Sequence, residues 1–384
     1  SWLWPTVYNK FVDFMIRGKD TEWVEDDQFT VYNADGTVNA SSLGGVRLRG
    51  NTSQAYPKKP LAVKLNSKQA VLGMPSHKRW VLLANWLDHS MIRNSVAFDI
   101  AHAMENSWKA NEALGTGVTW TVHGQNVELV IDGRHMGNYY LCEQIKIGGK
   151  RLNIQDCYED VLDAYKKDPT KPEPTFENCG YLLELDTNYD EDPKFKTTNG
   201  VPFMLKDAVP DDILSHVKTK VQKIEDYIDA GNFTEAYKLL DINSVIDQWL
   251  VWELAMNHEM LDPRSVYYFM DGDNKLSAAS VWDFDRATFQ NYDKAKSMGS
   301  SGDRLKQYDA WICNSASSST GTCVWMPQLI KDATFKAKVK ERWAAMLPYL
   351  QQIPAQIRLY GQQLAVSYSY DTAMWPTNKA AIQA

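Results

Sequence analysis

Two aspartates that lie two positions apart, Asp283 and Asp285, are well suited to hold a metal ion. They flank Phe284 at the end of an apolar run, so an extended strand would place both side chains on one face. Two carboxylates on one face repel each other unless a cation lies between them, and such oxygen ligands suit Mg²⁺. The pattern therefore indicates a magnesium site. A turn-capping aspartate or an ion pair with Arg286 is the alternative.

A polar stretch upstream, residues 257–265, could supply a base and an anion-binding group. Either Glu259 or Asp262 can accept a proton from a hydroxyl, and the guanidinium of Arg264 can bind a phosphate. His258 is interpreted as a structural residue.

A loop at residues 49–59 combines small residues, hydroxyls and lysines between two expected strands. Its polar side chains and backbone N–H groups could bind phosphates; the side chains concerned are Asn51, Ser53, Gln54 and Lys58. The alternative is an ordinary hairpin loop with solvated lysines.

Lys64 differs from the loop lysines because it lies inside the expected strand 61–65, between apolar residues. An ammonium that faces inward there needs a carboxylate or a phosphate as its partner. An ammonium that faces outward would be only a lysine of an edge strand. Phosphoryl transfer requires a cation for the phosphates, carboxylates for magnesium and a carboxylate near the acceptor hydroxyl, and this sequence offers candidates for each.

The segments that must position these residues predict an α+β fold. Strand patterns, with a turn at Asp132 and Gly133, occur in the first half at 29–32, 45–49, 61–65, 119–122, 127–131 and 139–143. Between them, apolar residues one turn apart predict a helix over 88–104, with Asp88 as its cap. The second half is predicted to be mainly helical, with helices at 217–230 and 244–257 and strands at 181–185, 203–206, 266–270 and 276–282.

The composition excludes several classes of protein. The 384 residues include 48 Asp and Glu against 41 Lys and Arg, a net charge of −7, which argues against nucleic acid as a partner. No run approaches the roughly 20 apolar residues of a membrane span. The length suits two domains or one bilobal domain. We predict one bilobal domain, with a strand-rich lobe at 1–150 and a mainly helical lobe at 151–384.

The cysteines offer two pairs that could form disulfide bonds. Cys157 and Cys179 bracket a charged, proline-bearing insert, and Cys313 and Cys323 flank a polar loop. Cys142 lies inside an apolar run, where we expect it to behave as a small hydrophobic residue.

Taken in order, several segments resemble the spore-coat CotH kinase family. They run from about residue 45 to 290 and comprise RLRGNTS (47–53), KKPLAVK (58–64), KRWVLLANWLD (78–88), MIRN (91–94), GNYYLCEQI (137–145), GYLLELD (180–186) and VWDFD (281–285). The resemblance implies a bilobal, atypical protein-kinase-like fold that uses ATP and Mg²⁺ to phosphorylate Ser or Thr hydroxyls of proteins. In that fold the ammonium and the acids would face each other across two lobes.

The resemblance also implies roles for individual residues. Lys64 corresponds to the strand lysine that binds the α- and β-phosphates, Asp283 to the metal-binding aspartate and Asp262 to the catalytic-loop aspartate. The segment Glu143, Gln144 and Ile145 corresponds to the connection whose backbone meets adenine.

Other assignments stay open. The acidic partner of Lys64 has no clear match, so Asp88, Glu105 and Glu143 are all candidates, while Arg93 or Arg264 would neutralise phosphate charge. One departure from the family pattern is Ser265, which stands where an asparagine would hold a second metal ion. One magnesium ion, slow turnover and no catalysis are therefore all compatible with the sequence.

The expected partners are a nucleotide and a protein substrate. We expect a monomer at an extracellular or cell-surface location, with its signal peptide removed. The rival interpretation is a non-catalytic adhesion or scaffold module, on a cell surface or in a plant-polymer-degrading assembly. In that case some of the 14 tryptophans would be sugar-stacking platforms, although Trp249 and Trp252 fit core positions. Carbohydrate hydrolysis by two carboxylates is a third possibility.

Overall fold

The computed structural model describes residues 22–257, 259, 263–286, 288–289, 311–314 and 324–376. The chain divides into two compact units, each built from segments that are not contiguous in sequence. Unit 1 comprises the described residues within Ser1–Val96, Val122–Gln144 and Pro354–Gln383. Unit 2 comprises those within Ala97–Thr121 and Ile145–Ile353. This division differs from a single boundary near residue 150. Residues 97–121 precede that boundary but belong to unit 2, and residues 354–376 follow it but belong to unit 1.

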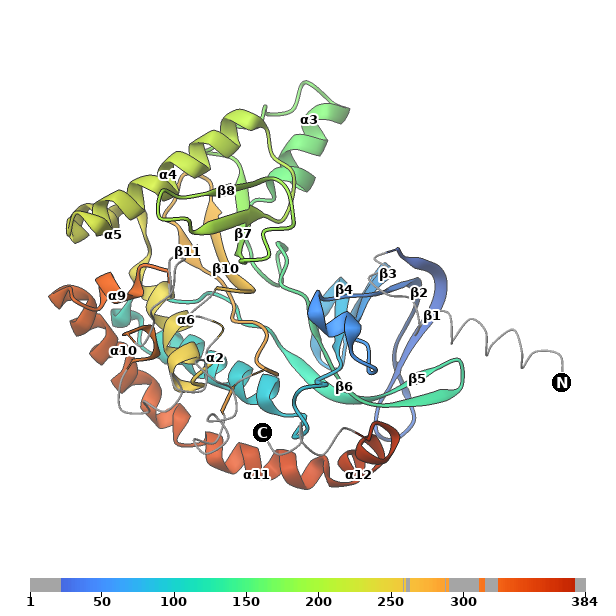
Figure 1. The fold of residues 1–384 in the computed structure, drawn as a ribbon. Coiled ribbons are helices and arrows are strands. Elements are labelled where there is room, and N and C mark those ends of the chain that lie inside the picture. The colour runs from blue at the N-terminus through green and yellow to red at the C-terminus, as the bar shows by residue number, and fades with distance from the viewer. Residues whose placement is uncertain are drawn as a thin grey trace. The chain divides into compact units, whose positions relative to one another are not determined.

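Unit 1 is built on a six-stranded antiparallel sheet, whose strand order is β1-β2-β3-β4-β6-β5 (Figure 1). The strands are β1 (Val24–Tyr32), β2 (Val38–Leu48), β3 (Leu61–Val71), β4 (Met74–Leu83), β5 (Gly124–Ile131) and β6 (Arg134–Glu143). A one-turn 3-10 helix, η1 (Thr52–Ala55), lies in the β2–β3 loop. Every second residue of the central strands enters one core, which includes Leu48, Val63, Trp80, Leu82 and Leu141.

The β5–β6 hairpin follows from its turn residues. Asp132 and Gly133 have φ angles of 48° and 77°, the left-handed pair that a two-residue turn of type I′ requires. The hairpin prediction is therefore confirmed, and its register runs from Ile131↔Arg134 to Gly124↔Cys142.

Helix α2 (Arg93–Ala110) replaces the predicted helix 88–104. Asp88 acts as a cap, because its carboxylate accepts the backbone N–H of Arg93 at 2.8 Å. The predicted strand at 119–122 is wrong. That segment forms no ladder. The hydroxyl of Thr121 donates to Glu105, and the N–H of Val118, the residue before the segment, donates to Asp247.

The last helices are α11 (Ile353–Gln363) and α12 (Ala365–Met374). Helix α12 belongs to unit 1, where it lies against β6 (Figure 1).

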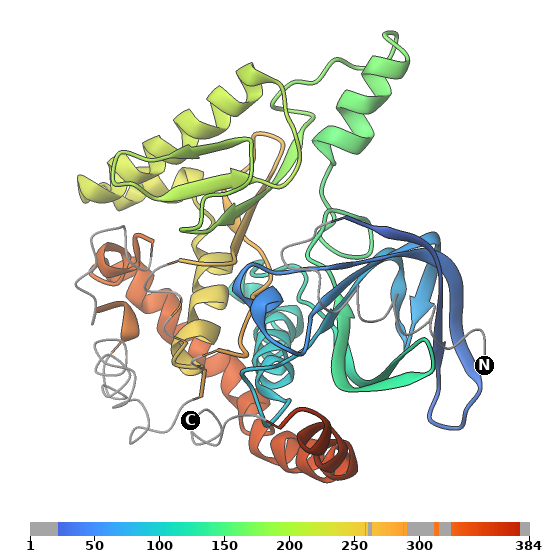
Figure 2. The same ribbon diagram turned by 45° about the vertical axis from the view of Figure 1, so that its right-hand side comes forward.

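Unit 2 contains a second antiparallel sheet, whose order is β11-β10-β7-β9-β8. Its strands are drawn in green and orange in Figure 2. Its strands are β7 (Gly180–Leu185), β8 (Lys194–Lys196), β9 (Pro202–Leu205), β10 (Val266–Asp271) and β11 (Ser277–Ala278). Three of the four predicted strand segments of the second half correspond to β7, β9 and β10, and β7 is buried along its whole length. The fourth, 276–282, is wrong for the most part: only Ser277–Ala278 is a strand, and the segment that carries Asp283 is not.

Helices make up the rest of unit 2. They include α3 (Asp163–Lys167), α4 (Asp211–Asp229), α5 (Phe233–Leu239), α6 (Ile242–Leu254), α9 (Met326–Leu329) and α10 (Ala333–Leu350). The π-helix η3 (Cys157–Leu162) and the 3-10 helices η2 (Glu112–Leu114) and η6 (Ile312–Asn314) are shorter. The predicted helices 217–230 and 244–257 correspond to α4 and α6. Trp249 and Trp252 are buried on α6, which confirms that they are core residues.

The buried interior of unit 2 also holds an ion pair. Both nitrogens of the Arg342 fork meet the Asp247 carboxylate, with Nε–Oδ1 at 2.5 Å and Nη2–Oδ2 at 2.6 Å. Arg342 also donates to the backbone carbonyls of Leu114 and Gly115. This pair therefore ties α10, α6 and the segment after α2 together.

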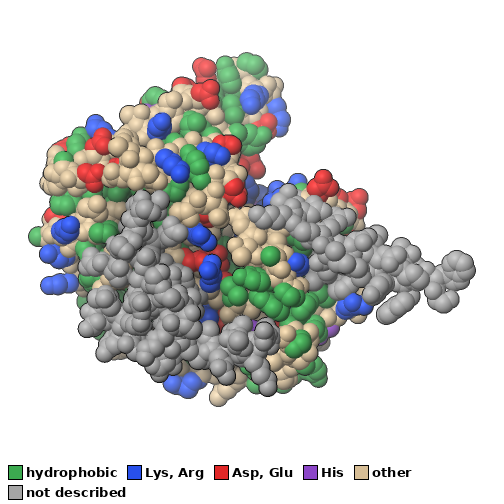
Figure 3. All heavy atoms as spheres, viewed as in Figure 1, with side chains coloured by type: hydrophobic (Ala, Val, Ile, Leu, Met, Phe, Trp, Pro, Cys, Tyr) green, Lys and Arg blue, Asp and Glu red, His purple; other side chains and the backbone are tan. Residues whose placement is uncertain are grey.

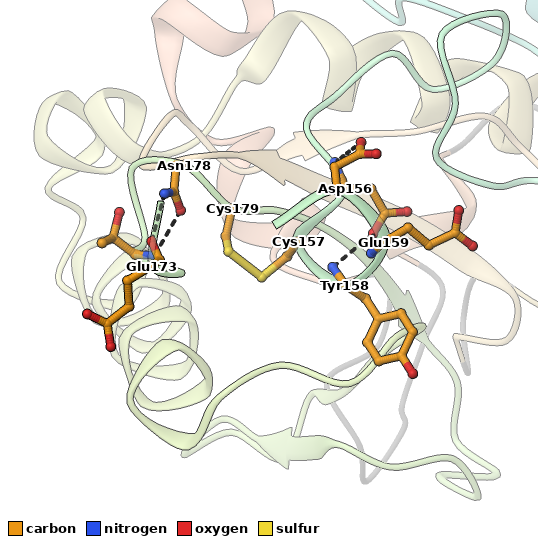
Figure 4. The surroundings of a disulfide bond; sticks show 9 residues. Asp156, Cys157, Tyr158, Glu159, Glu173, Asn178 and Cys179 are labelled. Atoms are coloured by element: carbon orange, nitrogen blue, oxygen red, sulfur yellow. Dashed lines mark hydrogen bonds between the residues drawn. A yellow bond between two sulfur atoms is a disulfide. The ribbon is translucent and has the colours of Figure 1, made fainter. Parts of the chain in front are cut away.

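A disulfide bond joins Cys157 to Cys179, as predicted (Figure 4). Asp156 beside it accepts the backbone N–H groups of Tyr158 and Glu159, each at 2.9 Å. The other predicted pair cannot be described, because Cys323 lies outside the described residues.

Acidic and basic side chains are interspersed on the molecular face of Figure 3, in keeping with the modest net charge. Among the helices that the structure describes, none is both long and apolar enough to cross a membrane.

Candidate active site

Lys64 lies on a central strand and faces away from the core of unit 1. Its neighbours Val63 and Leu65 are buried in that core, whereas the Lys64 side chain is exposed. The strand order excludes the edge-lysine interpretation, because β2 and β4 flank β3 on both sides. An exposed ammonium on this face can meet an anion that arrives from solvent.

The surroundings of Lys64 are rich in charge. Its direct partners across the sheet are Gly45 and Arg79, and the ring of Trp23 lies 5.1 Å from the Arg79 guanidinium. The carboxylate of Glu25 covers Gly45, with an oxygen 2.7 Å from where a Cβ would stand. Glu25 is thus an acid near Lys64 that sequence reasoning missed, because the two residues come together only through strand pairing.

The three acids considered as partners of Lys64 each bind elsewhere in their own unit. Asp88 accepts the N–H groups of Ser90 and Arg93, and it lies 3.6 Å from the Arg93 guanidinium. Glu105 accepts the Thr121 hydroxyl at 2.7 Å and pairs with Lys109.

Glu143, the third candidate, is completely buried and accepts the backbone N–H and the ring nitrogen of His123, both at 3.0 Å. It pairs across the sheet with Trp80, a core residue, whereas Lys64 pairs with the next residue along, Arg79. Alternation therefore puts the two side chains on opposite faces of the sheet. Glu143 has a structural role here, while the adenine-binding role of the backbone at Glu143, Gln144 and Ile145 stays a prediction.

The predicted phosphate-binding loop holds its residues in different ways. Asn51 is exposed and Ser53 half-buried, so both polar groups can reach a ligand. Gln54 is buried and donates to the Gly50 carbonyl, while Lys59 donates to the Gln54 carbonyl. These two bonds close the loop upon itself around η1.

Lys58 has a partner that sequence reasoning did not find. Its ammonium is buried and lies 2.7 Å from an oxygen of Asp371 on α12 and 2.5 Å from the carbonyl oxygen of Asn138. The structure therefore gives Lys58 a role in the packing of unit 1 in place of a direct contact to phosphate.

The acids of unit 2 come from three different segments. Asp283 and Asp285 follow β11, Glu259 follows α6, and Asp186 follows β7. Asn257, which is completely buried, connects two of these segments. Its side chain donates to the Asp283 carbonyl at 3.3 Å and accepts the N–H of Glu259 at 2.9 Å.

The acids influence each other electrostatically. Burial, and after it the nearby charge of Asp283, raise the pKa of Glu259 to about 8 against the opposing effect of Arg286 and Arg264. Burial also raises the pKa of Asp186 to about 6, although the N–H groups of Asn188 and Ser265 bond to its carboxylate. Because these carboxylates lie close together, a bound cation would reduce the repulsion between their negative charges.

Asp283 has an unusual backbone conformation, with a φ of 67°. A non-glycine residue in the left-handed region costs free energy, and such residues concentrate at functional sites. Buried aromatic residues on both sides support it, since Phe284 packs on Trp252 at 5.1 Å and Trp282 on Phe98 at 6.0 Å between ring centroids. Aromatic packing therefore holds the chain on both sides of a residue whose backbone conformation costs free energy.

The other predicted charged residues are also placed. Arg264 donates to the hydroxyl of Thr187 at 3.3 Å, on the segment that follows Asp186. Arg286 pairs with Glu259 at 3.6 Å. Asp262 lies outside the described residues. Asp186 was not given a role from sequence, although a carboxylate at the end of a buried strand is a usable signal.

The donor set suits magnesium. Within the described part of the chain, no group of three or more His, Cys, Asp or Glu side chains is arranged to hold a metal ion. Mg²⁺ does not require one, because proteins hold it by one or two carboxylates together with substrate phosphates and water. Asp283, beside the buried Glu259, meets that requirement, and Asp285 could add a second carboxylate.

Residues 46–384 match the family described as CotH kinase protein. The chain belongs to the CotH kinase protein family. The match covers both units, so the family likeness inferred from the seven segments is confirmed, and it makes a kinase-like activity the expected class of function for this CotH-family chain. No curated protein matches the chain.

Proposed function

We propose that this CotH-family chain is a protein kinase that transfers the γ-phosphate of ATP to Ser or Thr hydroxyls of secreted or surface proteins. The observation that carries the proposal is the group of acids in unit 2, in which buried Glu259 lies close enough to the conformationally strained Asp283 for the charge of Asp283 to raise the pKa of Glu259. Family membership supports the class of reaction.

Candidate groups for this chemistry occur in each unit. In unit 1, Lys64 offers an exposed ammonium on the non-core face of the sheet, and Asn51 and Ser53 offer polar groups in the β2–β3 loop. In unit 2, Asp283 and Asp285 would hold Mg²⁺. When bound, this ion would neutralise the charge of the nucleotide phosphates.

The transfer step needs one base and several cations. Asp262 orients the acceptor hydroxyl and takes its proton, with Glu259 as the second candidate for this role. The hydroxyl oxygen forms a bond to the γ-phosphorus while the bond from that phosphorus to the β–γ bridging oxygen breaks, and ADP leaves with the electron pair. Lys64, Arg93 and Arg264 compensate the negative charge on the phosphates.

Labelled ATP tests the proposal. The chain incubated with Mg-ATP should label itself or casein, and Asp283→Ala should lower the labelling rate by about a hundredfold or more. Asp163→Ala is the control, because Asp163 makes only an exposed ion pair with Lys167 on α3. Labelling that survives Asp283→Ala unchanged refutes the metal assignment.

The same assay identifies the base. Asp262→Asn should abolish labelling while Glu259→Gln retains part of it. The opposite result would transfer the role of base to Glu259.

The rival function is a non-catalytic module that binds carbohydrate. The observation in its favour is that Trp311 and Trp343 are 42% and 37% exposed, so either ring could stack on a sugar. Calorimetry with Mg-ATP and with a panel of oligosaccharides separates the two functions, and heat from oligosaccharides alone would favour the rival.

We also propose an extracellular or cell-surface location. The disulfide bond between Cys157 and Cys179 supports it, because such bonds persist mainly in oxidising compartments. The presence of this bond in protein isolated from its native host would test the proposal.

A further inference from the structure

The C-terminal helix of unit 1 contacts the predicted phosphate-binding loop through a buried ion pair. Lys58, at the end of that loop, donates from Nζ to Asp371 on α12 at 2.7 Å. The two side chains are only 3% and 12% exposed. They are 313 residues apart in the sequence, so the contact joins the C-terminal helix to a loop of the N-terminal sheet.

Asp371 also binds the β5–β6 hairpin. The oxygen that meets Lys58 accepts the backbone N–H of Asn138 at 2.9 Å, and Lys58 itself donates to the carbonyl of Asn138. The preceding residue, Gly137, has a φ of 88°, and a Cβ there would lie 2.2 Å from the Asp371 oxygen. The absence of a side chain at Gly137 therefore makes room for the carboxylate.

Aromatic side chains make a second connection between the end of α12 and the same loop. Trp375 donates to the Met136 carbonyl at 2.8 Å and meets the edge of Trp86, with ring centroids 6.4 Å apart. Trp86 in turn stacks on Tyr56 of the loop at 6.2 Å. The loop is thus held at two of its residues, Tyr56 and Lys58.

The buried ammonium of Lys58 needs a counter-charge, and Asp371 supplies it. Burial lowers the pKa of Lys58, and Asp371 makes the largest contribution in the opposite direction. Removal of the carboxylate would leave the ammonium buried without its counter-charge, which is strongly unfavourable. The loop would then have to release Lys58 toward solvent.

We propose that α12 and Trp375 form a strap that holds the loop 49–60 in its nucleotide-binding conformation, with Lys58 and Asp371 as positioning residues. This inference rests on the proposed function, because it assigns the phosphates of ATP to this loop. Lys58 acts through the loop: the Gln54–Gly50 and Lys59–Gln54 bonds transmit its position to Asn51 and Ser53.

The test compares nucleotide affinity with loop exchange in the full chain. Asp371→Asn removes the charge and keeps the shape, while Lys58→Met with Asp371→Asn removes the whole pair, so that no unpaired buried charge remains. Ser367→Ala is the matched control on the same helix. It deletes the bonds of the Ser367 hydroxyl to the Asn138 side chain and to Glu128, and it leaves the Lys58–Asp371 contact in place. Each variant is assayed by calorimetry with Mg-ATP and with adenosine, and by hydrogen exchange of residues 51–56.

We expect both charge variants to raise the Kd for Mg-ATP about tenfold and the Kd for adenosine less than twofold, with faster exchange at 51–56. The control should behave as the parent chain does. An equal loss of ATP and adenosine affinity, or unchanged ATP affinity in both charge variants, overturns the proposal.

Failure of the proposed function would look different. If the parent chain binds no nucleotide, hydrogen exchange by itself tests whether α12 and Trp375 hold the loop. Faster exchange at 51–56 in the double variant supports it, and unchanged exchange overturns it.

Discussion

Loss of the disulfide bond between Cys157 and Cys179 should destabilise unit 2 by an amount that the loop length determines. The bond spans 22 positions of the sequence and is buried. Closing a loop of this length removes about 11 cal/mol/K of entropy from the unfolded chain, which is about 3 kcal/mol at 25 °C. The bridged segment holds only short helices, η3 and α3, so few other interactions limit its freedom after unfolding.

The assay is urea unfolding of three samples: the oxidised chain, the chain reduced with a phosphine, and the variant Cys157→Ala with Cys179→Ala. Reduction keeps both sulfur atoms in place, so it isolates the effect of the crosslink, and we expect a loss of about 3 kcal/mol. The double variant also loses the packing of two buried sulfurs and should be destabilised at least as much.

Local contacts should keep the native segment in place after reduction. Asp156 still caps η3, and the N–H of Gly180 still donates to the carbonyl of Gln155 at 2.7 Å. Equal unfolding midpoints for the oxidised and reduced chains would refute the entropy argument, provided that alkylation without reductant leaves Cys157 and Cys179 unmodified. Alkylation of both residues in the untreated protein would show that the bond does not form.

Three further predictions concern stability. Asp247→Asn should cost about 3 to 5 kcal/mol in denaturant unfolding, because it leaves the buried Arg342 without its counter-charge, whereas Asp163→Asn on the exposed surface of α3 should leave the midpoint unchanged. Gly137→Ala should cost about 1 to 3 kcal/mol in thermal unfolding, since it combines a φ of 88° with a clash against Asp371. Gly149→Ala, where the nearest atom lies 3.8 Å from the new Cβ, should be tolerated. In EDTA, stability should fall as pH rises from the ordinary pKa of a glutamate toward about 8, because native Glu259 keeps a proton that the unfolded chain has lost; a Glu259→Gln variant with the same pH slope would contradict this.

Residues that interact over short distances in the chain were the most predictable. The hairpin turn at Asp132 and Gly133, the helices α4 and α6, and the cap formed by Asp88 all follow from local patterns. The predicted strand at 119–122 failed because no neighbouring strand pairs with it. The N–H just before it, that of Val118, donates to a side chain from a distant segment, Asp247. A period-two pattern reports strand propensity, and it contains no information on whether a neighbouring strand is available.

The residues of the candidate site differ in the same way, because local patterns predicted some of them and only the tertiary structure decided the others. The types and spacing of Asp283, Asp285 and Lys64 were sufficient to suggest phosphate chemistry, and the order of the motifs was sufficient to identify the family. The sequence also indicated the pairing of Cys157 with Cys179, because few cysteines are available. It left open whether Lys64 faces the core, and the structure decided that it does not.

Only the tertiary structure decided which charged groups meet. It pairs Lys58 with Asp371 and puts the side chain of Glu143 on the face of the sheet opposite Lys64. It also brings Asp186 close enough to Glu259 to raise the pKa of Glu259. The physical reason is that a buried charge must find a counter-charge somewhere in the fold, and any acid that packing brings within reach satisfies it. Which acid comes within reach depends on the path of the whole chain, so the sequence around either partner does not reveal the pair.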